Sequence, residues 1–259
     1  MIGEAGHEKS ILKNMTRDIK AALAVHRASE IHGSALGPWI HDIVYGAHDG
    51  IVTTFAVVAG TAGAGLSWGV VIVIGVANLL ADAVSMGAGS FLSIRSERDQ
   101  YHRLLKEELE EIEKDPDIER EEVREFYAAK GFAGADLDRV VAVITGDKKV
   151  WAATMMHEEH GMVEESGNGA LLHGFATFLG FVAFGCVPLL PYFAFREGAN
   201  NFSLAIIGTA AALILLGVTR SFVTRERMYR GVIEIFLIGA VTASIAYGVG
   251  VALKSFAGV

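Results

Sequence analysis

Seven carboxylate and thioether side chains of this 259-residue sequence lie three or four residues from another member of the set, in stretches rich in helix formers. They are Glu108, Glu111, Glu119, Glu122, Met155, Met156 and Glu159. Residues at this spacing share one face of a helix, and like charges placed so cost about 0.2–0.5 kcal/mol in an isolated helix. A divalent cation held between the helices would reverse that cost. Carboxylate oxygens suit Fe²⁺, Mn²⁺ and other first-row ions, whereas methionine sulfur favours softer ones.

The same residues also have a plainer interpretation, which the sequence leaves open. Helices rich in Glu, Lys and Arg usually present a solvated face, and methionines more often fill a core than bind an ion. His157 and His160 could join a metal site, but a histidine of this kind is more often an ordinary surface residue. A soluble di-iron bundle is excluded because it needs Glu-x-x-His pairs on two helices, and only Glu4 with His7 has that spacing.

A second set of polar residues lies within strongly apolar stretches. Asp49 occupies one stretch, and Asn78, Asp82 and Met86 follow one another at intervals of four in the next. An ionisable group at membrane depth costs about 2.5–3.5 kcal/mol on insertion scales, so these four residues indicate a transport pathway or relay. The alternative is that Asp49 lies at the interface and only anchors its helix. We expect His48, Asp42 and Glu234, which lie nearer the ends of apolar stretches, to be ordinary interface residues.

The composition requires that apolar and charged residues be segregated along the chain. Hydrophobic residues make up 52% and charged residues 20%, and the mean hydropathy is +0.40. Five apolar stretches approach or exceed the roughly 20 residues that a membrane-crossing helix needs, namely 43–64, 68–92, 169–193, 202–219 and 231–253. We therefore predict an all-α membrane protein with five transmembrane helices. Pro188 and Pro191 should kink or end the third span. Gly46 with Gly50, and Ala83 with Gly87, are small residues four apart that favour close helix packing.

The segment between the second and third spans differs in kind from the rest. Residues 95–168 hold 20 of the 30 acidic residues and no apolar run long enough to span a membrane. We predict three helices here, over 96–115, over 118–130 and from 136 to beyond Glu165. The predicted domains are an N-terminal tail (1–40), the first two spans (41–94), this helical metal-binding insertion (95–168) and the last three spans (169–259).

The distribution of Lys and Arg predicts the orientation. Twenty of the 22 basic residues fall in the tail, in the insertion and in the loop at 220–230, which five spans place on one side. Because basic loops stay in the cytosol, the N-terminus and the insertion should be cytosolic. The net charge of −8 argues against a nucleic-acid partner. The single cysteine, Cys186, excludes a disulfide scaffold and cysteine-based zinc sites.

Three motifs together resemble the vacuolar iron transporter family. They are Asp42-Ile-Val-Tyr-Gly-Ala-His-Asp-Gly-Ile51, Asn78-Leu-Leu-Ala-Asp-Ala-Val-Ser-Met-Gly87, and the end of the Glu-rich insertion, Met155-Met-His-Glu-Glu159. The resemblance implies a homodimer with a pore at the dimer interface, lined by the first two helices. It also implies export of Fe²⁺ and related divalent ions from the cytosol in exchange for protons. By position, Asp49 and Met86 would be pore ligands, and the seven residues named first would be ligands of the cytosolic domain.

One position departs from the family pattern. The plant-type members have a glutamate where this chain has Asn78, and Asp82, one turn along, could supply the missing charge. The departure favours the plasma membrane of a prokaryote over a vacuolar membrane, although the sequence allows both. Fe²⁺, Mn²⁺, Co²⁺ and Zn²⁺ are the expected substrates, with no organic cofactor.

Two other classes of function compete with transport. A membrane-anchored metal buffer or sensor would need the cytosolic helices alone, and has no use for Asp49, Asp82 and Met86 inside the bilayer. An enzyme is not expected, because the sequence has no nucleophile elbow, no phosphate-binding glycine loop and no cysteine nucleophile in a polar setting.

Overall fold

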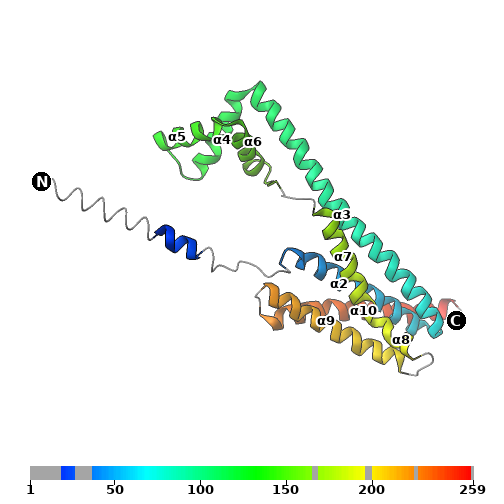
Figure 1. Ribbon diagram of the computed structural model, residues 1–259. Helices are drawn as coiled ribbons and strands as arrows, with labels where there is room; N and C mark the ends of the chain where they lie inside the picture. Colours follow the sequence, from blue (N-terminus) through cyan, green and yellow to red (C-terminus); the bar gives the residue numbers. More distant parts are fainter. Residues whose placement is uncertain (1–18, 27–36, 165–168, 196–199, 225–226, 258–259) are drawn as a thin grey trace.

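The computed structural model describes residues 19–26, 37–164, 169–195, 200–224 and 227–257, and every regular element in these ranges is helical. In chain order the elements after the short helix at 19–26 are η1 (Gly37–Trp39), α2 (Ile40–Ala64), α3 (Trp68–Lys114), α4 (Pro116–Ala129), α5 (Gly134–Thr145), α6 (Lys148–Glu158), α7 (Ala170–Gly185), η2 (Val187–Leu189), α8 (Leu190–Ala194), α9 (Asn201–Thr224) and α10 (Met228–Ala257). Five helical stretches are long and apolar enough to cross a membrane (Figure 1). The prediction of an all-helical protein with five spans is confirmed.

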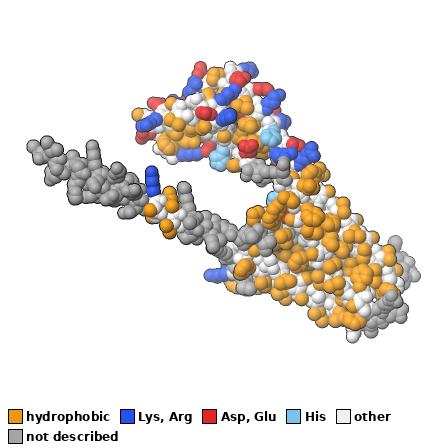
Figure 2. Space-filling view, in the orientation of Figure 1, with side chains coloured by type: hydrophobic (Ala, Val, Ile, Leu, Met, Phe, Trp, Pro, Cys, Tyr) orange, Lys and Arg blue, Asp and Glu red, His pale blue; other side chains and the backbone are white. Residues whose placement is uncertain are grey.

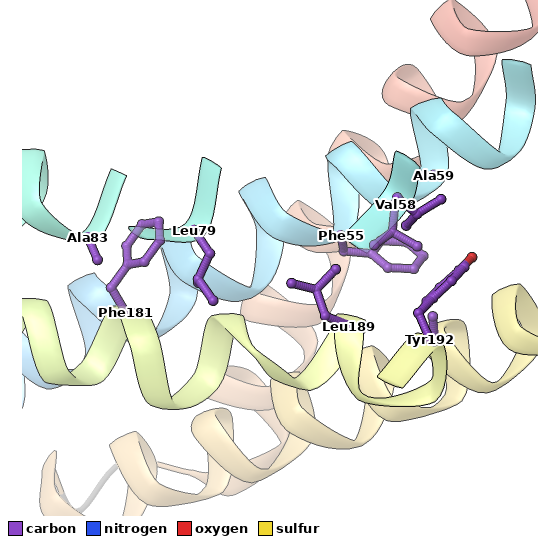
Figure 3. Close-up of a cluster of buried hydrophobic side chains, with 10 residues drawn as sticks. Phe55, Val58, Ala59, Leu79, Ala83, Phe181, Leu189 and Tyr192 are labelled. Atoms are coloured by element: carbon purple, nitrogen blue, oxygen red, sulfur yellow. The ribbon is translucent and has the colours of Figure 1, made fainter. Parts of the chain in front are cut away.

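The first span, α2, lies at the centre of the apolar bundle. It packs against α7, α10, α3 and α9, and half of its most apolar window is buried, compared with 17–33% in the other four spans. Phe55 and Val58 of α2 share one apolar cluster with Phe181 of α7 and with Leu189 (Figure 3). Asp49 is therefore carried by the helix that has the most protein around it.

Glycines allow α2 and α3 to approach α7 at backbone distance. A Cβ atom at Gly46 would fall on the carbonyl oxygen of Thr177, and one at Gly50 would fall on that of Phe181. On α3, a Cβ at Gly87 would lie 2.9 Å from the carbonyl oxygen of Gly174. The expectation that these small residues serve helix packing is confirmed, and the packing joins the first three spans tightly.

The second span continues without a break into the polar region. Helix α3 has 47 residues, which at 1.5 Å per residue extend over about 70 Å. Figure 1 shows it leaving the bundle and reaching the helices α4, α5 and α6. The domain boundary expected at 94/95 thus lies inside one continuous helix. We call residues 95–164, the end of α3 with α4–α6, the polar subdomain; its charged surface contrasts with the apolar bundle (Figure 2).

The third helix predicted for the insertion is wrong in its extent. It is divided into α5 and α6 at Gly146 and Asp147, because the Asp147 side chain accepts hydrogen bonds from the backbone N–H groups of Lys149 and Val150 and so begins a new helix. It also ends at Glu158 rather than beyond Glu165. Gly161, with φ of +63°, turns the chain in a conformation that glycine adopts readily.

The prolines act as predicted at the end of the third span. Helix α7 ends at Gly185, and Pro188 lies in the turn η2 that follows. Pro191 lies at the start of the short helix α8. Neither ring could be accommodated inside a longer helix without loss of a backbone hydrogen bond.

The α2–α7 contact predicts the effect of adding one methyl group. Gly50→Ala should lower the thermal unfolding midpoint in detergent, because overpacking against backbone typically costs about 1–3 kcal/mol. Gly248→Ala on α10 is the matched control, since its Cβ would meet no atom of the described residues within 4 Å. Alanine is the better helix former, so this control should be neutral or stabilising. Equal midpoints for Gly50→Ala and wild type would contradict the described packing.

Candidate metal centre

Two glutamates of the polar subdomain are buried instead of lying on a solvated face. Glu108 on α3 is 2% exposed and Glu119 on α4 is 6% exposed. The Oε2 atom of each is buried and has no hydrogen-bond partner within the described part of the chain. Buried polar atoms are nearly always paired, so an unpaired carboxylate oxygen calls for a proton or a cation.

Glu108 belongs to two groups of side chains whose ligand atoms converge. One group is Glu108, Glu111 and Glu119, and the other is Glu108, Glu159 and His160; within each group the ligand atoms lie within 4.8 Å of one another. Oxygen or nitrogen ligands at about 2.1 Å from one ion lie up to about 4.2 Å apart. If the ligand atoms of either group moved slightly closer together, they could therefore coordinate one ion.

The carboxylates of this cluster raise one another's affinity for protons. The pKa of Glu119 is raised to about 7, first by burial and then by the charges of Glu122, Glu108, Glu111 and Glu159. The pKa of Glu122 is also raised, first by burial and then by Glu159 and Glu111. Five predicted ligands from three segments thus share one electrostatic environment, and a divalent cation is the natural counter-charge.

Local sequence explains how these groups come together. Glu108 and Glu111 lie on the last two turns of α3, and Pro116 begins α4 directly after Asp115, so that Glu119 and Glu122 follow on its first turns. The apolar side of the same helices packs as a core.

The two predicted methionines lie in the interior. Met155 belongs to the apolar core of the polar subdomain, together with Ile112 and Val123, and Met156 is buried too. The placement of Met155 agrees with its interpretation as core filler. By contrast, Glu111 and Glu159 are exposed at the edge of the cluster, where an arriving ion would meet them.

His160, which the sequence allowed as a ligand but favoured as an ordinary surface residue, lies beside Glu108. Its Nε2 atom lies 2.9 Å from Oε1 of Glu108. Helical spacing could not identify it, because it follows the end of α6. The signal in the sequence is Gly161, since a glycine after a helix commonly reverses the chain.

The four residues predicted to form a pathway lie on the adjacent helices α2 and α3. Asn78 Nδ2 donates a hydrogen bond of 2.7 Å to Asp82 Oδ2, and Met86, one turn further, packs against the apolar core of the bundle. Asp49 lies on α2, which packs directly against α3, the helix that carries Asp82. The structure therefore places two carboxylates, an amide and a thioether on the same pair of helices.

Asp42 differs from the ordinary interface residue that was expected. It is 4% exposed, and its Oδ2 lies 2.6 Å from His173 Nδ1, which links α2 to α7. Glu234 is paired with Arg220 at 2.9 Å, with both side chains accessible, as expected for an interface residue.

The chain is similar in sequence to known proteins over most of its length. A sequence profile of the VIT family matches residues 40–251, which covers both the bundle and the polar subdomain. This chain belongs to the VIT family. It is 34% identical to vacuolar iron transporter 1 of Eucalyptus grandis over 87% of this chain and 90% of that protein. It is 32% identical to vacuolar iron transporter 2 of Oryza sativa (91% and 96%) and to the vacuolar iron transporter of Plasmodium falciparum (82% and 81%). The resemblance inferred from the three motifs is confirmed, and membership makes the chain a multi-pass membrane protein.

The electrostatics of Glu119 predict how metal affinity depends on pH. Mn²⁺ affinity should rise between pH 6 and pH 8, because a cation and a proton compete for Glu119, whose pKa is about 7. Glu119→Gln should lower the affinity at pH 8 by about tenfold or more and flatten the pH dependence. Isothermal titration of the purified chain measures both. Glu110→Gln, an exposed neighbour paired with Lys106, should bind as wild type does; equal loss in both variants would contradict this assignment.

The same group predicts the stability of the metal-free protein. Between pH 4.5 and about 7, folded Glu119 holds a proton that the unfolded chain has released. Its contribution to stability is thus fully present below pH 4.5 and is lost as the pH rises through 7. With a chelator present, wild type should lose more unfolding free energy between pH 5 and pH 8 than Glu119→Gln. Identical pH profiles by denaturant unfolding would show that Glu119 titrates normally.

Proposed function

We propose that this protein transports divalent metal ions across a membrane, with Fe²⁺ as a substrate and Mn²⁺, Co²⁺ and Zn²⁺ able to use the same ligands. The observation that carries the proposal is the placement of Asp49 and Asp82 on two neighbouring helices of an apolar bundle. Charged groups at such depth are expected along an ion path and serve no purpose in an anchor. The relatives are named as iron transporters, which favours transport over catalysis.

We infer that ions move from the cytosol outward, with the N-terminus and the polar subdomain in the cytosol. The positive-inside distribution of Lys and Arg supports this orientation. The carboxylate cluster around Glu108 and Glu119 would then concentrate ions on the cytosolic side. Helix α3 carries Glu108 near its C-terminal end and Asp82 within the bundle. One helix thus contributes residues to both the cluster and the path.

Proton antiport follows from competition at the pathway carboxylates. A carboxylate must be deprotonated to bind a metal ion. Asp49 or Asp82 would release a metal ion on the outer side as it takes up a proton, and would release that proton on the cytosolic side. Asn78 holds one oxygen of Asp82 by a hydrogen bond, which orients the carboxylate although the plant-type glutamate is absent.

We further propose a homodimer in which α2 and α3 of two copies enclose the path. Asn78, Asp82 and Met86 are only partly buried in a single chain. Polar groups in the hydrocarbon region need partners from protein or from a water-filled cavity. A second copy facing the same side of α3 would supply that enclosure.

The decisive test is Fe²⁺ uptake into proteoliposomes with an acidic lumen. Wild type should accumulate Fe²⁺ only with the pH gradient, and Asp49→Ala should abolish this uptake because the path loses a ligand and a proton carrier. Asp117→Ala, an exposed residue of α4, should transport at the wild-type rate. Wild-type flux in Asp49→Ala would reject the assigned path. Absence of flux in every variant, with metal binding intact, would identify a membrane-anchored metal buffer instead.

A further inference from the structure

The chain directly after α6 forms a turn that places the side chain of His160 against α3. The backbone N–H of Glu159 donates to the carbonyl of Met155, and that of Met162 donates to the carbonyl of Met156. Gly161 lies between them with φ of +63°. The two hydrogen bonds close the end of the helix, and His160 is the residue that the turn presents to Glu108.

The imidazole of His160 contacts only one of the two oxygens of the buried Glu108 carboxylate. Its Nε2 lies 2.9 Å from Oε1 of Glu108, and 22% of its side chain remains accessible. The other oxygen of Glu108 is buried and has no partner within the described part of the chain. The hydrogen bond therefore leaves Oε2 of Glu108 unsatisfied, and this oxygen calls for a proton or a cation.

The accessible neighbour Glu159 completes a mixed set of ligands. Atoms of Glu108, Glu159 and His160 converge within 4.8 Å, and a neutral imidazole is the commonest metal ligand of proteins. The second group, Glu108 with Glu111 and Glu119, offers carboxylates alone. The two groups share Glu108 but differ in the chemistry that they present to an ion.

We propose that His160 is a ligand of the metal centre and that its imidazole sets the preference among substrate ions. Imidazole suits Fe²⁺, Zn²⁺ and other later first-row ions, whereas sets of carboxylates alone suit Mn²⁺ and Mg²⁺. A centre that includes His160 therefore favours Zn²⁺ and Fe²⁺ over Mn²⁺ more strongly than carboxylates would. This inference rests on the proposed function, because it assumes that the centre collects transported ions.

The matched pair of variants is His160→Gln and His157→Gln. His157 lies three residues earlier on α6, is exposed and belongs to neither converging group. Both substitutions keep a polar side chain of similar size, and unfolding midpoints within the error of wild type show that both variants fold. The full chain in detergent is used, in an Asp49→Asn background that removes a pathway ligand from the binding signal.

Binding of Zn²⁺ and Mn²⁺ is measured by competition with a chelating dye. His160→Gln should weaken Zn²⁺ binding by about tenfold or more and Mn²⁺ binding by less than about threefold, whereas His157→Gln should change neither. Zinc-edge X-ray absorption at substoichiometric Zn²⁺ should show imidazole scattering that His160→Gln removes and His157→Gln retains.

The outcomes separate this inference from the proposed function. An unchanged ratio of Zn²⁺ to Mn²⁺ affinity in His160→Gln, or retained imidazole scattering, would overturn the role of His160. If Glu119→Gln weakens binding in the same experiment, the metal centre itself stands. If neither Glu119→Gln nor His160→Gln alters binding, the metal centre of the proposed function fails along with this inference.

Discussion

The burial of Glu108 and Glu119 beside three further carboxylates is the constraint on which the polar subdomain depends. Two carboxylate oxygens lie in the interior without a partner in the described part of the chain. Burial, and after it the repulsion of the neighbouring carboxylates, raises the pKa of Glu119 to about 7. An apolar core around Met155 holds these groups in place. We infer that a bound cation would compensate for the unfavourable free energy of burying these carboxylates.

Helix α3 joins this centre to the membrane bundle. Because it runs unbroken from Trp68 to Lys114, the position of Glu108 is tied to that of Asp82 on the same helix. Close glycine contacts of α2 and α3 with α7 keep the pair Asp49 and Asp82 on adjacent helices. We therefore propose that ion collection near Glu108 and ion passage near Asp82 depend on one continuous helix and its neighbours.

The sequence was sufficient for those features that depend on periodicity and hydropathy. Five spans, the effect of Pro188 and the helical pairing of Glu108 with Glu111 all follow from local patterns. The division of the last polar helix did not, because the cap formed by Asp147 competes with an apolar periodicity that continues through it. The sequence allowed His160 as a ligand but favoured an ordinary surface residue, since its position depends on a turn at Gly161 and on a contact with a residue 52 positions earlier. Such tertiary contacts leave no spacing in the sequence.

The most direct measurement is anomalous X-ray diffraction from crystals of the full chain grown with Mn²⁺ at pH 8. We expect an anomalous peak within coordination distance of the Glu108 carboxylate, between α3, α4 and the end of α6. Peaks found only at exposed carboxylates outside the cluster, with Glu108 and Glu119 still unliganded, would contradict it. The result would decide whether the buried charges exist to bind a cation.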